Sequence, residues 1–153
     1  MLLEWFDRQE LFETISAVGH RVVHGMGRME PEIVTSGLMD DLRRIESIDP
    51  DHLPGEIELI DALRLHAPAL PQVACFDTAF HRRMPRVARL MAVPRRLEAK
   101  GVQRYGFHGL SYAYLMAELA RSAGAAAVQG RVILAHLGNG ARISSFATAI
   151  FVS

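Results

Sequence analysis

A short apolar run, Gln72-Val73-Ala74-Cys75-Phe76-Asp77, predicts a buried β-strand that ends at the aspartate. Pro68 and Pro71 stand just before this run, and prolines at such a border mark the transition from a loop into a strand. Ser16 to Val23 is a second stretch of strand character, because Val18, Val22 and Val23 are β-branched and favour extended backbone. Both strands are expected to be short.

Helical patterns alternate with these strands. One helix is predicted to start at Thr35 or Ser36, either of which is a suitable N-cap, and a second starts at Pro54. A third helix is predicted from Leu110 to Arg121 with Gly124 as its stop, and an apolar strand from Arg131 to Ala135 follows it. The alternation of strands and helices predicts an α/β fold with a largely parallel or mixed sheet.

The composition excludes several classes of protein. The chain has 153 residues, half of them hydrophobic, which suits one core-forming domain. Its 17 basic residues equal its 17 acidic ones, so the net positive field typical of a nucleic-acid binder is absent. The single cysteine excludes an internal disulfide and fits a reducing compartment. With no apolar run of membrane-spanning length and no signal-peptide pattern, we expect a cytoplasmic protein without membrane contact.

The segment His20-Arg21-Val22-Val23-His24 offers two kinds of chemistry. Histidines four apart could share a metal ion on a helix, but on a strand they lie roughly 13 Å apart, which is too far. Arg21 at a strand end could instead grip a carboxylate or a phosphate with two N–H groups. The alternative is a surface arginine beside packed histidines.

Asp77 follows the carboxyl end of a buried strand, where α/β proteins place ligand-binding groups. Its carboxylate could accept a proton, orient water on Mg²⁺, or simply cap the following turn. His81 could pair with Asp77 or face solvent.

Two glycines flank Phe107-His108 in the segment from Arg104 to Ala113, so the backbone there must turn tightly or approach another group closely. His108 would stand just before a helix, whose N-terminus favours an anion. The segment is also a near miss to a nucleophile elbow, but it lacks an oxyanion motif.

His136-Leu137-Gly138-Asn139-Gly140 follows the apolar strand at 131–135. The exposed amides of such a turn could contact phosphate oxygens, although Asn-Gly is also a favoured hairpin turn. His52 precedes a helix start and could face the same site or act as an N-terminal capping partner.

Four segments occur in one order along the chain: AVGHRVVHG at 17–25, CFDTAFHRRMP at 75–85, QRYGFHGLSY at 103–112 and ILAHLGNGA at 133–141. In amino-acid sequence and order they closely resemble segments of the acetate kinase family, including its propionate-using members. The resemblance implies an incomplete ribonuclease-H-like fold of the acetate and sugar kinase, Hsp70 and actin superfamily. Residues 1–130 would be the latter part of the substrate-side N-terminal domain, and 131–153 the start of the nucleotide-binding domain.

The activity that the resemblance implies is reversible transfer of the γ-phosphoryl group of ATP, with Mg²⁺, to acetate or propionate. The products are an acyl phosphate and ADP, and the complete enzyme would be a homodimer. Alternatives are an inactive truncated remnant of such a kinase, or a relative that uses butyrate.

The resemblance also assigns roles to residues. Arg21 would hold the substrate carboxylate, Val23 and Phe107 would wall the pocket for its methyl group, and Asp77 and His108 would be catalytic. His136, Leu137, Gly138, Asn139 and Gly140 would contact the ATP phosphates, and His52 would be a further substrate-site residue. No magnesium ligand is expected within this chain, because the family's metal-binding residues match no part of it.

Three positions depart from the family's pattern: Met26 replaces a glycine, Asp51 replaces an apolar pocket residue, and Tyr112 replaces a histidine found in many members. The N-terminal phosphate motif and most of the second domain have no counterpart here. We therefore expect the chain to correspond to an internal third or so of such a kinase, and to be inactive alone.

Overall fold

The computed structural model describes residues 5, 8, 12–138 and 142–146. It divides into two compact units, residues 1–107 and residues 108–153, which are described separately below. Within the described residues, no helix is both long and apolar enough to cross a membrane.

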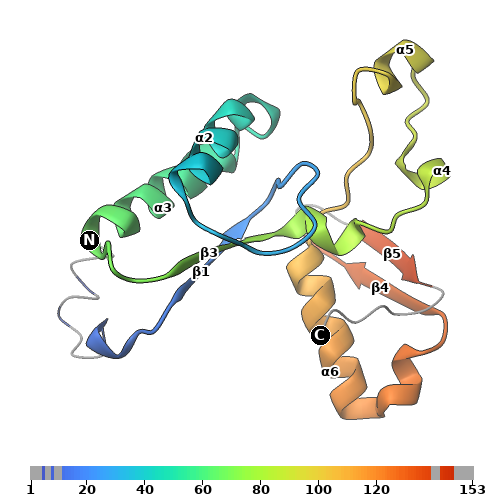
Figure 1. Cartoon of the computed structure of the whole chain (residues 1–153). Coiled ribbons are helices and arrows are strands. Elements are labelled where there is room, and N and C mark those ends of the chain that lie inside the picture. Colours follow the sequence, from blue (N-terminus) through green and yellow to red (C-terminus); the bar gives the residue numbers. More distant parts are fainter. Residues whose placement is uncertain (1–4, 6–7, 9–11, 139–141, 147–153) are drawn as a thin grey trace. The chain divides into compact units, whose positions relative to one another are not determined.

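The first unit contains three strands and several helices of α and 3-10 type. Its elements are η1 (Phe12–Thr14), β1 (Val18–Val22), β2 (Glu32–Ile33), α2 (Ser36–Arg44), η2 (Glu46–Ile48), α3 (Leu53–His66), β3 (Gln72–Phe76), η3 (Asp77–His81), α4 (Arg86–Arg89) and α5 (Arg95–Glu98). Figure 1 shows α4 and α5 on a long excursion of the chain away from the sheet. The arginine-rich segment that follows η3 thus holds two short helices.

The sheet of the first unit has the order β1-β3-β2. β1 runs parallel to β3, with Val18 opposite Gln72 and Val22 opposite Phe76, whereas β2 is antiparallel to β3. The predicted mixed α/β sheet is thus confirmed. Because β1 and β3 are parallel and in register, their carboxyl ends lie side by side, and the residues that follow them are brought together.

Two helices cover this sheet. Figure 1 shows α2 and α3 lying side by side, and their apolar residues pack with those of β1 and β3. Thr35 is the N-cap of α2, and its side chain accepts a hydrogen bond from the Leu38 amide at 3.2 Å. The core consists of Val22, Leu38, Met39, Leu42, Leu53, Ile57, Ile60, Ala74 and Phe76.

The second unit begins at His108 and consists of a helix followed by a hairpin. Its elements are α6 (Gly109–Ala123), η4 (Ala125–Val128), β4 (Val132–His136) and β5 (Arg142–Phe146). Gly124 ends α6 at a φ of 86°, as its predicted role as a stop requires. β4 and β5 pair antiparallel, with His136 opposite Arg142, so the two strands form a hairpin. The predicted division into domains at 1–130 and 131–153 stays a prediction.

Candidate functional site

The carboxyl ends of β1 and β3 bring Arg21 and Asp77 into an ion pair. Nε and Nη2 of Arg21 both donate to Oδ2 of Asp77, at 3.1 and 2.6 Å. The Asp77 side chain is 1% exposed, while that of Arg21 is 53% exposed. A buried carboxylate thus holds one side of a guanidinium whose other surface faces solvent, and that surface can take a second oxyanion.

Asp77 is the first residue of η3. Its two kinds of expected role, capping of this turn and contact with a ligand, both stay predictions. Burial of this carboxylate requires charged or hydrogen-bonded partners, and Arg21 supplies one of them.

Val23 follows β1, and the carboxylate of Glu56 holds its main chain. No motif in the sequence marks Glu56 as a site residue. The Val23 amide donates to both oxygens of Glu56, at 3.2 Å each. Glu56 lies in the first turn of α3 and is half-buried. Burial raises its pKa, against the opposing effects of the Val23 hydrogen bond and the charge of Arg21. In the sequence, only the position of Glu56 two residues after Pro54, at a helix start, indicates a role for Glu56.

His24 is 3% exposed and lies against two aromatic residues. Its ring centroid is 4.6 Å from that of Tyr105 and 5.6 Å from that of Phe107. Nδ1 accepts a hydrogen bond from the Met26 amide at 3.1 Å. Burial lowers the pKa of His24, with a smaller opposing effect from the charge of Asp49. His24 therefore links the turn after β1 to Phe107, a predicted pocket wall.

The turn after His24 carries the departure from the family's pattern noted above. Met26 has a φ of 54°, and the Arg28 amide donates to the Gly25 carbonyl at 3.0 Å. A left-handed φ explains why glycine suits this position, since a Cβ is strained there. The turn forms here with methionine at the left-handed position.

His20 and His24 do not form a metal site. His20 lies on β1 and donates from Nε2 to the side-chain oxygen of Gln72 at 2.8 Å, and His24 lies beyond the strand. Within the part of the chain that the structure describes, no group of three or more His, Cys, Asp or Glu residues could hold a metal ion.

His52 is the N-cap residue of α3, but its side chain makes no capping hydrogen bond. Its side chain is 54% exposed, and Nδ1 lies 2.8 Å from Oδ1 of Asp49. This hydrogen bond raises the pKa of His52. The capping interpretation is therefore wrong for the side chain, and a substrate-site role for His52 stays a prediction.

His81, the last residue of η3, contacts the segment that contains Phe107. Its Nε2 donates to the carbonyl oxygen of Phe107 at 3.0 Å. Gly106 allows this approach, since a Cβ there would come within 2.1 Å of the His81 ring. The predicted need for glycine next to Phe107 is thus explained by the packing of a histidine.

In the second unit, His108 is the N-cap residue of α6 and has a left-handed φ of 59°. Its ring stacks on that of His136, with centroids 3.9 Å apart and planes 7° apart. The ring of Tyr112, which is fully buried, meets His136 edge-on at 6.5 Å. Two predicted site histidines, one before α6 and one at the end of β4, are therefore in direct contact.

The loop after β4 is described in part. Leu137 is 77% exposed and Gly138 is also exposed, whereas Asn139 and Gly140 lie outside the described residues. The hairpin alternative is confirmed by the pairing of β4 with β5. The exposed Leu137 and Gly138 are compatible with contact to phosphate oxygens.

The donor set suits a magnesium–nucleotide complex better than a resident metal ion. Mg²⁺ is held in kinases by one or two carboxylates together with substrate phosphates. In the first unit, Asp77 is a carboxylate beside a cationic side chain, which fits the metal ion of such a complex. In the second unit, taken by itself, Leu137 and Gly138 are exposed after a strand, which fits contact with phosphate oxygens.

The chain matches known proteins over most of its length. The model of the Acetokinase family matches residues 1–150. An acetate kinase of Rhodopseudomonas palustris is 48% identical over 142 residues, which are 92% of this chain and 36% of that protein. An acetate kinase 2 of Neisseria meningitidis is 42% identical over 95% of this chain and 37% of that protein. The chain thus spans little more than a third of the length of these relatives.

Solved structures show the same fold. A propionate kinase of Francisella tularensis superimposes with a TM-score of 0.87 at 35% identity, over 97% of this chain and 38% of that one. An acetate kinase of Porphyromonas gingivalis gives 0.83 at 31% identity, over 96% of this chain and 40% of that one. The fold is therefore that of the acetate and sugar kinase, Hsp70 and actin superfamily, present here in part. The protein belongs to the Acetokinase family.

Proposed function

We propose that this chain provides the carboxylate-binding part of an enzyme that transfers a phosphoryl group between ATP and acetate or propionate. The observation that carries the proposal is the Arg21–Asp77 pair at the ends of two parallel strands. A guanidinium that is anchored on one side and exposed on the other suits the binding of a small carboxylate. It is not suited to act as a nucleophile. The names of the relatives, acetate kinase and propionate kinase, point to the same substrates.

Arg21 would bind the substrate carboxylate through two N–H groups and orient one oxygen for attack. Glu56 fixes the main chain of Val23, and His24 contacts the ring of Phe107. Val23 and Phe107 are thereby held in set positions, as walls of a small alkyl pocket must be. Such positioning accounts for much of the catalysis of phosphoryl transfer.

When bound, Mg·ATP supplies the phosphoryl group and, through the metal ion, neutralises charge on its oxygens. The substrate oxygen forms a bond to the γ-phosphorus as the bond from phosphorus to the β–γ bridging oxygen breaks, and ADP leaves. Asp77 would hold Arg21 and a hydrated metal ion in place, and His108, supported by His136, would donate to the transferring group. Residues 136–140 would contact the phosphates through main-chain amides.

We further propose that the 153 residues alone form a substrate half-site without turnover, that the active protein is a homodimer, and that it works in the cytoplasm. The coverage of the relatives supports the first assignment, because the chain matches 36% and 37% of the length of two acetate kinases. His52, exposed beside Asp49, would contribute to the substrate site.

A chimera tests the function. These residues replace the stretch that they match in the Rhodopseudomonas palustris acetate kinase, and hydroxylamine traps any acyl phosphate formed from acetate or propionate with ATP and Mg²⁺. We expect product from the chimera and none above background from its Asp77→Ala variant. A stable, folded chimera without acyl phosphate would contradict the proposal. The isolated 153-residue chain, run in parallel, is expected to give no product.

A further inference from the structure

A small cavity in the first unit is lined by arginine side chains that the proposed function does not use. The cavity holds about 60 Å³ and lies among the turn after β1, the end of η3 and the segment that precedes Phe107. Arg28, Arg82, Arg89 and Arg104 line it, and no aspartate or glutamate of the residues that the structure describes does. Arg21 and Asp77 do not line it, although Thr78 and Gly106, which do, neighbour Asp77 and Phe107 in the sequence.

Among the described residues, acids balance two of the four arginines. Arg28 pairs with Glu32 and Asp41, and Arg82 lies 3.6 Å from Glu30.

Arg89 and Arg104 have no acidic partner in the part of the chain that the structure describes. They are tied together through the main chain, because the Arg104 amide donates to the Arg89 carbonyl at 2.8 Å. The cavity wall therefore carries about two uncompensated positive charges.

Arg89 supplies a second observation. Its Nε is buried and has no hydrogen-bond acceptor among the described residues. A buried N–H of a charged group without an acceptor is costly, and native proteins rarely leave one so. An acceptor inside the cavity would satisfy it.

We propose that this cavity binds inorganic phosphate. Since one buried water needs about 10–15 Å³ on this measure, a cavity of about 60 Å³ has room for four or five heavy atoms, which is the size of a phosphate ion. Two uncompensated guanidinium groups match the charge of a phosphate dianion, and the planar fork of arginine suits its oxygens. The cavity is too small to enclose a nucleotide.

Equilibrium dialysis of radiolabelled phosphate against the 153-residue chain tests this proposal. The ionic strength is fixed with potassium chloride, so that non-specific attraction is constant. We expect one saturable site. Arg89→Met and Arg104→Met should each weaken binding about tenfold or more, the loss expected when a hydrogen bond to a charged group is removed.

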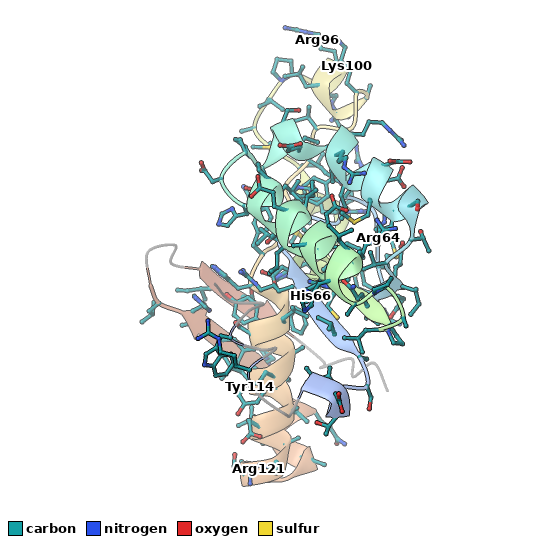
Figure 2. The ribbon with its side chains drawn as sticks, turned by 90° about the vertical axis from the view of Figure 1, so that its left-hand side faces the viewer. Arg64, His66, Arg96, Lys100, Tyr114 and Arg121 are labelled. Carbon is teal, nitrogen blue, oxygen red and sulfur yellow. The ribbon has the colours of Figure 1, made fainter. Side chains whose placement is uncertain are left out.

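Two control variants make the result specific. Arg96→Met removes an arginine from α5 that does not line the cavity and that Figure 2 shows at an outer tip of the chain. Arg21→Met removes the arginine of the candidate substrate site. Both should bind phosphate as the unchanged chain does. Acetate at equal ionic strength should not displace the phosphate.

Three results would overturn the proposal: no saturable binding, equal weakening by Arg96→Met, or loss of binding on Arg21→Met alone. Displacement by acetate at similar concentration would show a general carboxylate site instead. If Arg89→Met proves unfolded by circular dichroism, Arg104→Met decides the question, since that side chain is exposed.

Discussion

Gly25 lies where the ends of β1 and β3 approach each other, and replacing it with alanine should separate them. A Cβ on Gly25 would stand 2.6 Å from Cγ and 2.7 Å from Cβ of Phe76. Carbon atoms in contact are normally about 3.5–4.0 Å apart, so the overlap is about 1 Å. Phe76 is 2% exposed and belongs to the core, which leaves it little room to move.

The magnitude follows from two costs. Overpacking of a tight core costs about 1–3 kcal/mol. The Gly25 amide also donates to Oγ1 of Thr78 at 3.1 Å, and a shift that breaks this bond costs about 1 kcal/mol more. We therefore expect Gly25→Ala to lower the free energy of unfolding by about 2–4 kcal/mol, or the Tm by roughly 5–15 °C for a chain of this size.

Gly27→Ala is the matched control. A Cβ on Gly27 meets nothing within 4 Å, and this glycine has no left-handed φ. Its Tm should stay the same or rise slightly, because alanine reduces the entropy of the unfolded chain. Thermal unfolding followed by circular dichroism measures both variants. Equal Tm values for Gly25→Ala and Gly27→Ala would refute the close approach of the two strand ends.

Three further changes test individual parts of the site by chemical unfolding. Met26→Gly should stabilise the protein by about 0.5–1 kcal/mol, because glycine relieves the left-handed strain at φ 54° and Met26→Ala does not; no difference between the two would refute the strain. The raised pKa of Glu56 means that the folded state binds this proton more tightly, so stability should fall as pH rises above 4.5 through the higher folded pKa. Glu56→Gln keeps an acceptor for the Val23 amide and should remove that fall in stability. The free energy of unfolding of the variant should exceed that of the parent at pH 7 and equal it near pH 4. The lowered pKa of His24 has the opposite effect, because the free energy of unfolding should fall as pH falls below 6.5. His24→Asn should reduce this dependence of stability on pH. Unchanged pH profiles in these two variants would contradict the assigned burial.

Local patterns were enough to predict the main elements. β3 spans Gln72–Phe76 as predicted, and Thr35 is the N-cap from the two candidates. These features depend on nearby residues, such as flanking prolines and capping hydroxyl groups. β2 (Glu32–Ile33) was not predicted, because a two-residue strand exists only through its pairing with β3. β5 likewise depends on its partner β4, although the Asn-Gly pair did indicate a hairpin turn.

The site was predicted as separate residues rather than as contacts. Arg21 and Asp77 were both identified, but their ion pair spans 56 positions of sequence and depends on the parallel register of β1 and β3. Glu56 was missed because its function here is to hold an amide of another element. The stacking of His108 on His136 could not be read from spacing, since it depends on how β4 returns along α6.

Steady-state kinetics of the chimera with Arg21→Ala would show whether Arg21 binds the substrate carboxylate. We expect the KM for acetate to rise about tenfold or more, with a much smaller change in the KM for ATP, whereas Asp77→Ala and His108→Ala should mainly lower kcat. An unchanged KM for acetate in a folded Arg21→Ala chimera would mean that Arg21 does not bind the carboxylate.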